Sequence, residues 1–476
     1  MDKLLGGGIT ERSLVLIAGN PGMGKTTLAG AIAFSACSMG LKSLYVSLVE
    51  DEEAFLEHMD SIGLDLRGCR DKGLFHFMDA VYVASWETLT DLLANMYEKV
   101  VVDGFRLIVI DSITAFLQVV DDKPRIREIL RNFFARALGK SGATVIALSE
   151  LPIGAEVIGS GVEEFLADAL IYLRAEMVHN RMDRRMEIRK VKWAPLVRVK
   201  VPYRITPGKP IEVYAPESMP EAYLESVSFR RLFSGVEHLG KKNGGLVELL
   251  DASGKPITPS EVEAIGRAAN LPHGIPIVHY YKSPTGIAAI LVTLTLLWEP
   301  GENVTVLSTK LPRYYSGTLL KELLGVREGN LSVYNINPAF YTLAEFTGLT
   351  HDVIERDKPN LFILEGMDLL RLMGPCDEVI DDILNLTTWL RMRRVSPVYI
   401  YYREPEQEIL SHVGVVVEAD PEEMFVVEKN GRIWQHVNVK LRSSFSNISV
   451  ILRYDVGLLS KLMRKAFMNN AGKRGE

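Results

Sequence analysis

The chain has 476 residues, of which 47% are hydrophobic and 24% are charged, enough for two or three globular domains with substantial cores. Its formal net charge is −6, so the surface as a whole lacks the basic excess that is typical of nucleic-acid-binding proteins. The opening MDKLLGGG does not have the segments of a secretory signal, and the longest apolar stretch, 286–298, suits a buried helix and not a membrane span.

The three cysteines, Cys37, Cys69 and Cys376, are widely separated, and none belongs to a Cys-x-x-Cys pair. This spacing suggests neither a zinc site nor a disulfide framework. We therefore expect a cytoplasmic protein in a reducing compartment.

Residues 19–26, GNPGMGKT, match the GxxxxGK[ST] pattern of a phosphate-binding loop, or P-loop. The apolar segment 13–18 before the loop suits a buried strand, and the small apolar residues 27–39 after it suit a helix packed closely on a sheet. The backbone N–H groups of such a loop and the N-terminus of its helix together bind polyphosphate. The alternative is a glycine-rich turn without a ligand.

The side chains of this loop have predicted roles in binding ATP and Mg²⁺. Lys25 is expected to contact the β- and γ-phosphates and Thr26 to bind Mg²⁺ through its hydroxyl, while Gly22 and Gly24 let the backbone approach the phosphates. The other loop residues predicted to bind the nucleotide are Gly19, Asn20, Pro21, Met23 and Thr27.

Two further predicted strands, 44–48 and 105–112, end close to acidic residues. Ligands of open α/β sheets lie beyond the carboxyl ends of the strands. We therefore predict that Asp111 supports Mg²⁺ as a Walker B aspartate and that Glu50 orients the attacking water. The alternative for Glu50 is a place in the acidic first turn of a helix.

A covering helix is predicted at 125–138, followed by another buried strand at 144–150. Ser149 and Glu150 lie at the end of that strand, where a side chain can sense the γ-phosphate. We assign this role to Ser149, and the alternative for both residues is a solvated strand end.

The chain becomes basic between Arg181 and Lys200. Alternation along a strand places Lys190 and Lys192 on one face. Such residues either keep a solvated edge strand from aggregating or form a basic finger that approaches a phosphate. That phosphate would belong to the nucleotide of a neighbouring subunit or to a nucleic-acid backbone.

Taken together, these motifs resemble the RecA-like ATPase domain of the KaiC family over about residues 1–210. The resemblance is carried by DKLLGGGI, GNPGMGKTT, YVSLVEDEE, FRLIVIDS, TVIALSE and KVKW…VPYRIT, in this order. It implies a homo-oligomeric ring, expected to be hexameric, in which Lys190 and Lys192 act in the active site of the adjacent subunit. The family usually has two adjacent glutamates after the second strand, where this chain has Val49 and Glu50, so we expect slow hydrolysis.

The second half of the chain repeats the order of the first in a degenerate form. Residues 216–220 are a plausible linker between predicted domains 1–217 and 226–476. A strand is expected at 275–281 and an apolar helix at 287–297.

Slowly drifting sequence offsets relate the two halves and support an ancient duplication. They pair Gly24 with Gly286, Asp111 with Glu365, Lys190 with Lys440 and Lys192 with Arg442. Ile287 and Ala288 then replace the phosphate-binding lysine and the metal-binding threonine. We therefore predict a KaiC-like pseudo-ATPase domain that does not bind MgATP.

The sequence thus predicts an α/β fold of two tandem RecA-like P-loop domains, each a mostly parallel sheet covered by helices. The predicted function is that of a slow, Mg²⁺-dependent ATPase that acts as an oligomeric nucleotide-driven switch, with a protein partner. The alternatives are a recombinase-like DNA-binding ATPase and a non-hydrolysing, nucleotide-gated scaffold. The basic C-terminal tail, 458–474, is expected to dock or to be flexible, and the alternative is contact with a membrane surface.

Overall fold

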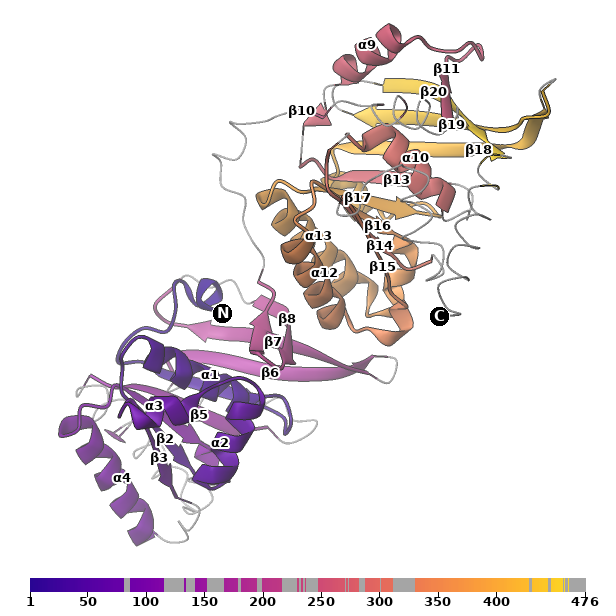
Figure 1. Cartoon of the computed structure of the whole chain (residues 1–476). Coiled ribbons are helices and arrows are strands. Elements are labelled where there is room, and N and C mark those ends of the chain that lie inside the picture. The colour runs from indigo at the N-terminus through magenta and orange to yellow at the C-terminus, as the bar shows by residue number, and fades with distance from the viewer. Residues whose placement is uncertain are drawn as a thin grey trace, which may run out of the picture. The chain divides into compact units, whose positions relative to one another are not determined.

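The chain divides into two compact units, Met1–Ala215 and Pro216–Glu476, and each unit is built on one large sheet (Figure 1). The computed structural model describes residues 1–80, 86–114, 132–133, 142–151, 167–178, 181–194, 199–215, 229–230, 233, 236, 247–269, 271–272, 274–281, 287–299, 301–310, 330–427, 430–443, 447–456, 458 and 461. The predicted linker, the loop before the second apolar helix, and nearly all of the predicted helix 125–138 and of the basic tail lie outside these residues.

The sheet of the first unit has the strand order β3-β2-β4-β5-β1-β6-β7-β8-β9. The strands are β1 (Leu14–Gly19), β2 (Ser43–Ser47), β3 (Phe75–Asp79), β4 (Leu107–Asp111), β5 (Thr144–Glu150), β6 (Ala169–Val178), β7 (Arg181–Val191), β8 (Val199–Thr206) and β9 (Lys209–Val213). Strands β1 to β6 pair in parallel, whereas β7, β8 and β9 extend the sheet in antiparallel fashion. The carboxyl ends of β1, β2, β4 and β5 therefore meet at one edge of the sheet, where ligands of such folds bind.

Helices of the first unit cover both faces of this sheet (Figure 1). They are η1 (Asp2–Leu5), α1 (Lys25–Ser38), α2 (Glu52–Ser61), α3 (Leu66–Asp71) and α4 (Trp86–Val101). One core cluster contains side chains of α1, α2 and α3, and the cluster on the other face contains side chains of α4. A Cβ atom on Gly30 would meet the sulfur of Met59, so α1 packs closely against α2. The α1 side chains Leu28, Ala29 and Ala33 share a core cluster with residues of the strands, as the small apolar run predicted.

A disulfide between Cys37 and Cys69 joins the end of α1 to α3, with a Cα–Cα distance of 6.1 Å. It corrects the prediction drawn from the cysteine spacing, and it removes the support that this spacing gave to a reducing compartment. The bond closes a loop with a sequence separation of 32 residues, for which chain entropy predicts a stabilisation of about 3–4 kcal/mol. Sequence spacing could not reveal it, because the fold alone brings α1 and α3 together.

The sheet of the second unit has the order β11-β20-β19-β18-β13-β17-β16-β14-β15. Its strands are β11 (Val247–Leu250), β13 (Ile277–Tyr281), β14 (Val304–Ser308), β15 (Leu331–Asn335), β16 (Leu361–Glu365), β17 (Ser396–Tyr401), β18 (Val415–Val427), β19 (Ile433–Ser443) and β20 (Asn447–Asp455), and β10 (Phe229–Arg230) pairs separately with β12 (Leu271–Pro272). From β15 to β20 this order repeats the order from β3 to β8 in the first sheet. The prediction of two tandem α/β domains is confirmed.

Helices again lie on both faces of the second sheet. The helices are η4 (Pro338–Phe340), η5 (Met367–Leu372), α9 (Pro259–Ala269), α10 (Ile287–Leu297), α12 (Leu343–Asp357), α13 (Cys376–Met392) and α14 (Gln407–His412). Helix α10 belongs to one core cluster, and α12 and α13 belong to the other. Among the helices of the described residues, none combines the length and the apolar composition that crossing a bilayer would need.

The registers of the two sheets correct one pairing between the halves. Starting on β4 and moving one strand at a time across the first sheet, each residue pairs with the next in the series Ile110, Ala147, Leu16, Leu170 and Lys190. From β16, those that pair across the second sheet are Leu364, Tyr399, Val278, Val416 and Arg442. Lys190 therefore corresponds to Arg442 and not to Lys440. The offset failed because β7 has a bulge opposite Leu170 and Ile171, whereas β19 pairs continuously with β18 at this level. Counting on from Arg442 puts Ser444 in the place of Lys192, so the second domain does not keep both cations of the finger.

Candidate functional site

The P-loop connects the carboxyl end of β1 to α1, as the sequence predicted. Gly22 has φ 78° and Gly24 has φ 85°, in the left-handed region that favours glycine. Gly19 is required for another reason, because a Cβ atom there would overlap the carbonyl oxygen of Leu173 on β6. The loop can therefore follow this path only with glycine at these positions.

Strand β8 and the residue that follows β5 both contact the loop. The Tyr203 hydroxyl on β8 donates to the Met23 carbonyl oxygen at 2.6 Å, and the Asn20 side-chain amide donates to the Leu151 carbonyl oxygen at 3.0 Å. Burial raises the pKa of Tyr203, so its hydroxyl remains a donor. A Cβ atom on Gly24 would overlap the side chain of Ile205, which also lies on β8. Strand β8 thus packs directly against the loop, a contact that the sequence did not predict.

The Lys25 side chain is folded back against the loop. Its ammonium donates to the carbonyl oxygens of Gly19 at 2.9 Å and Asn20 at 3.0 Å, and the residue is only 8% exposed. Burial lowers the pKa of Lys25, while the carboxylates of Glu150 and Asp111 oppose this shift. The ammonium is therefore held within the loop, at the position where a phosphate would meet it.

Asp111 lies at the end of β4 and accepts two hydrogen bonds on one carboxylate oxygen. The hydroxyl of Thr26 donates at 2.8 Å and that of Tyr45 at 2.9 Å. Burial raises the pKa of Asp111, and the two hydroxyls and Lys25 oppose this shift. A hydroxyl and a carboxylate that meet beside a phosphate-binding loop are oxygen ligands that suit Mg²⁺. Tyr45 was missed, because in the sequence a buried tyrosine of a strand looks like any other core aromatic residue.

Glu50 lies between β2 and α2. Helix α2 begins at Glu52, and its N-cap is Asp51, so the first-turn alternative applies to the residues after Glu50 and not to Glu50 itself. The Ser47 hydroxyl donates to the Glu50 carbonyl oxygen at 2.7 Å and accepts from its N–H at 3.0 Å. Burial and the charge of Asp111 raise the pKa of Glu50.

Ser149 is fully buried at the end of β5, so the solvated-end alternative does not describe it. Its hydroxyl lies 3.4 Å from that of Thr114, which also accepts a hydrogen bond from the Glu150 N–H at 2.9 Å. The Glu150 side chain, in contrast, is exposed. Thr114 therefore joins the loop after β4 to the end of β5, and the pattern of the sequence did not single it out.

Lys190 and Lys192 lie at the opposite edge of the sheet from the P-loop. Strand β7 ends at Val191, so Lys192 lies just after the strand. The expectation that Lys192 belongs to the same strand as Lys190 is therefore wrong. The Lys192 ammonium contacts Asp168 at 2.8 Å, and Asp168 accepts from the N–H of Leu14, the first residue of β1. The P-loop begins at the other end of β1, about 16 Å away at the usual rise per residue. The structure therefore does not bring the finger to the P-loop of the same chain.

The fold and the loop define a RecA-like P-loop ATPase domain, and comparison with known proteins shows what it resembles. Residues 1–218 match the family model described as ATPase: KaiC, so the first domain is KaiC-like.

Several relatives are similar to this chain. A UPF0273 protein of Pyrococcus furiosus is 27% identical over 227 residues, which cover 45% of this chain and 90% of that protein. A circadian clock oscillator protein KaiC of Picosynechococcus is 26% identical over 253 residues, which cover 52% of this chain and 48% of that protein. The circadian clock protein KaiC3 of Synechocystis is 23% identical over 406 residues, which cover 84% of this chain and 76% of that protein. This last alignment is long enough to extend well into the second domain.

The Tyr203→Phe variant tests how far β8 fixes the loop. Loss of the hydroxyl leaves the buried Met23 carbonyl without its donor, so we expect roughly tenfold weaker nucleotide binding, or about 1.4 kcal/mol, with the fold retained. Calorimetric titration with ADP measures this change. Tyr214→Phe removes another buried tyrosine hydroxyl and is the control. Equal affinities in wild type and Tyr203→Phe would show that the contact does not position the loop.

Proposed function

We propose that the chain is a Mg²⁺-dependent ATPase whose catalytic site lies in the first domain. The observation that carries this proposal is a P-loop whose carbonyl oxygens hold the Lys25 ammonium and whose Thr26 hydroxyl donates to Asp111 at the end of β4. Within the site, residues 19–27 bind the phosphates through backbone N–H groups and the Lys25 ammonium. Thr26 and Asp111 would hold Mg²⁺, which neutralises phosphate charge when it is bound. Ser149 and Thr114 support the strand end at which the γ-phosphate would lie.

The loop lysine gives the direct test of this function. Lys25→Ala should abolish ATP binding and turnover, and the wild-type chain should bind one nucleotide, because only the first loop has a lysine and a threonine at these positions. Calorimetric titration with MgATP gives both stoichiometry and affinity. Lys282→Ala changes the lysine of the second loop and should bind ATP like the wild type. Two sites of similar affinity would contradict the assignment of the second domain as inactive.

We propose that Glu50 orients the attacking water. It lies outside α2, a few residues after the end of β2, where Ser47 pairs with Asp111 of β4. Val49 precedes it, with 62% of its surface exposed, where the resemblance leads us to expect a second acid. One positioned carboxylate in place of two is consistent with slow turnover, because such a group contributes about 10² to 10⁴ in rate.

Substitutions at these two positions test the slow turnover. Val49 is exposed, so Val49→Glu should fold normally and hydrolyse ATP faster than the wild type. Glu50→Gln keeps the size of the side chain and should lose nearly all turnover, with ATP binding retained. Steady-state phosphate release measures both rates. Unchanged turnover in both variants, with binding intact, would transfer the role to another residue, with Glu150 the next candidate.

We propose that Lys190 and Lys192 act in trans, in a homo-oligomeric ring. The support is their position at the edge of the sheet away from the P-loop of their own chain. Positive charge supplied by a neighbouring subunit can raise a phosphoryl-transfer rate by about 10³ to 10⁵. A ring of six subunits remains a proposal from the resemblance.

Mixed oligomers test the trans role. The variant with Lys190→Ala and Lys192→Ala should bind ATP with little turnover, and loss of the exposed Lys192–Asp168 ion pair should hardly change its stability. Mixing it with Lys25→Ala subunits, which have intact fingers, should restore part of the activity. Phosphate release from oligomers of measured composition is the readout. Mixed oligomers without any recovery would contradict action in trans.

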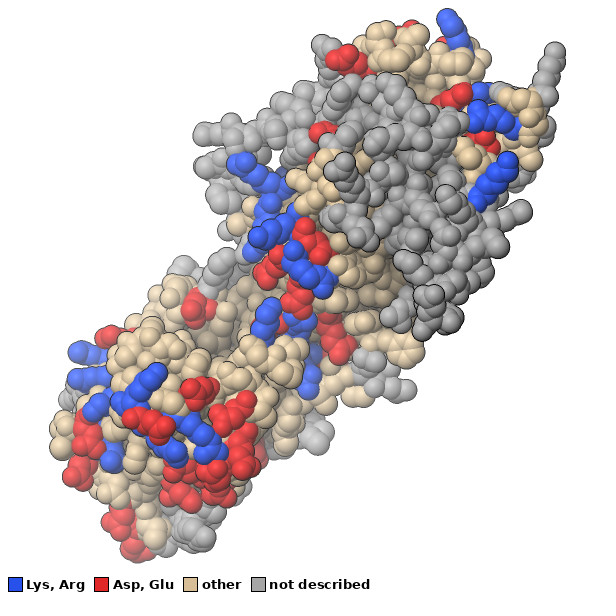
Figure 2. Space-filling view, in the orientation of Figure 1, with Lys and Arg blue, Asp and Glu red and all other residues tan. Residues whose placement is uncertain are grey.

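Charge pairing weakens the alternative of a nucleic-acid-binding surface. Within the basic stretch, cations with acidic partners are Arg185 with Asp183, Arg189 with Glu187, Lys192 with Asp168 and Lys200 with Glu176. Figure 2 also shows basic and acidic side chains interspersed over the described part of the first unit in that view. DNA binding that weakens steeply with salt would restore this alternative. One bound nucleotide without turnover would instead favour a nucleotide-gated scaffold, which the apolar Val49 permits.

A further inference from the structure

The carboxyl ends of β14, β16 and β17 form the counterpart of the ATPase site in the second domain. The two registers are the same here, since Ser47 pairs with Asp111 in the first sheet and Ser308 with Glu365 in the second. By position, Val49 corresponds to Lys310, Asp111 to Glu365, Thr114 to Asp368 and Glu150 to Tyr402.

Two pairs of equivalent hydrogen bonds, one of each pair in each domain, support this correspondence independently. The Val49 N–H donates to the Ser47 hydroxyl at 3.3 Å, and the Lys310 N–H donates to the Ser308 hydroxyl at 3.2 Å. Likewise, the bond from the Glu150 N–H to the Thr114 hydroxyl has its equivalent in the bond from the Tyr402 N–H to Asp368, at 3.4 Å. The backbone of the two sites is thus alike, and the side chains differ.

In the second domain these side chains contact one another. The Lys310 ammonium lies 2.9 Å from Asp368 and 4.0 Å from the centre of the Tyr402 ring. The Tyr402 hydroxyl donates to Glu365 at 2.5 Å, and the Ser308 hydroxyl donates to the other oxygen of the same carboxylate. Glu365 is fully buried, and the side chains of Lys310 and Asp368 are 23% and 13% exposed.

Charge balance explains why the Lys310 ammonium lies among these acidic side chains. Two carboxylates in a poorly solvated site require a positive charge nearby, since an uncompensated buried charge is strongly destabilising. In the first domain the corresponding region offers a threonine hydroxyl and an aspartate to a metal ion. The second domain has Ala288 in the place of that threonine, and its Walker B acid is satisfied by a serine and a tyrosine. These residues do not fit Mg²⁺.

We propose that Lys310 is a built-in cation, which supplies the positive charge of this second site and makes its structure independent of metal and nucleotide. The ammonium is covalently part of the chain, so the site keeps its charge balance whether or not the first domain is loaded. A divalent ion would have to displace Lys310 from Asp368 and compete with its charge. The inference concerns the second domain alone and does not require the first domain to hydrolyse ATP.

Hydrogen exchange of the full-length chain, followed by mass spectrometry without nucleotide, tests this proposal. In the wild type, peptides covering η5 and the end of β17 should exchange equally with millimolar Mn²⁺ and with EDTA. Lys310→Ala should make these peptides exchange at least about tenfold faster, because Asp368 then lacks its counter-ion. Millimolar Mn²⁺ should reverse part of this change, since it can occupy the space and replace the lost charge.

Two further variants make the result specific to the charge. Lys310→Arg keeps the cation and should remain protected and insensitive to Mn²⁺. The double variant with Lys310→Ala and Asp368→Ala removes both charges and should recover part of the protection without metal. This variant still tests the proposal if Lys310→Ala alone folds poorly. Wild-type exchange in Lys310→Ala, or faster exchange that neither Mn²⁺ nor the double substitution reverses, would overturn the proposal.

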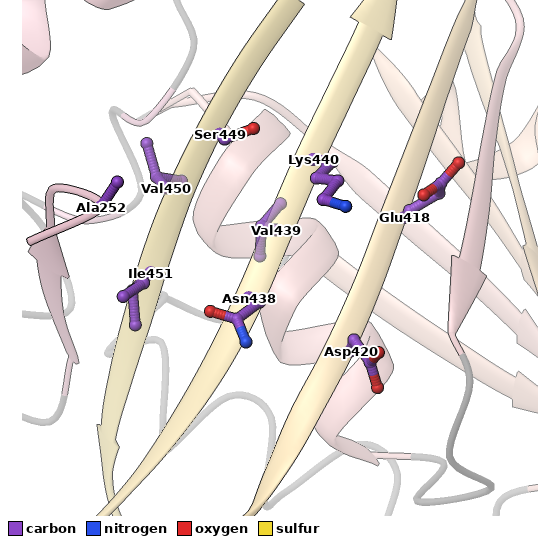
Figure 3. A pocket seen from close by; sticks show the side chains of 9 residues that line it. All are labelled: Ala252, Glu418, Asp420, Asn438, Val439, Lys440, Ser449, Val450 and Ile451. Carbon is purple, nitrogen blue, oxygen red and sulfur yellow. The ribbon is translucent and has the colours of Figure 1, made fainter.

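Lys440→Ala is the matched control. Lys440 is exposed in a groove of about 260 Å³ on the face of β18, β19 and β20 (Figure 3), and β18 and β13 separate its strand from β17. Removal of this lysine should leave exchange near η5 unchanged. Nucleotide stoichiometry and turnover report on the first domain, so failure of this proposal and failure of the proposed ATPase are seen in different measurements.

Discussion

The ATPase site depends on one buried carboxylate, that of Asp111. It joins three elements, because it ends β4 and accepts hydrogen bonds from Thr26 on α1 and Tyr45 on β2. Its raised pKa means that the ionised form is costly in the folded chain, and that this cost applies above the ordinary pKa of an aspartate. A cation bound beside Asp111 recovers this free energy. The proposed Mg²⁺ beside Asp111 would therefore offset a cost that falls on the group that organises the site.

The two domains surround the acid at the end of the corresponding strand with different side chains. Their strand orders and registers agree from the edge strand to the antiparallel extension, so both place an acid at the end of the corresponding strand. In the first domain Asp111 accepts hydrogen bonds from the hydroxyls of Thr26 and Tyr45. In the second, Glu365 is fully buried and hydrogen-bonded to Ser308 and Tyr402, with the ammonium of Lys310 nearby. The difference between the two sites thus involves more than Ile287 and Ala288 in the place of Lys25 and Thr26.

The sequence was sufficient for features that depend on neighbouring residues in the chain. The P-loop, the strand before it and the aspartate at the end of β4 follow local patterns, and the structure has them where they were expected. Contacts between distant segments could not be predicted, because only the fold brings them together: Tyr203 to Met23, Tyr45 to Asp111, and Cys37 to Cys69. The bulge in β7 could not be predicted either. It changes the sequence offset within a strand, so matching like residues gave Lys440 where pairing gives Arg442.

Position 49 and its counterpart, Lys310, connect the chemistry of the two sites. In both domains this residue follows a short turn in which a serine hydroxyl accepts from its N–H, so the backbone presents the side chain in a similar way. Val49 is exposed, whereas Lys310 turns toward Asp368 and Tyr402. Under the functions proposed for the two sites, an acid at this position would assist hydrolysis, an apolar side chain would slow it, and a lysine would close the site to a metal. A single position beside the Walker B strand would therefore separate a slow site from a closed one, with a similar backbone beneath both.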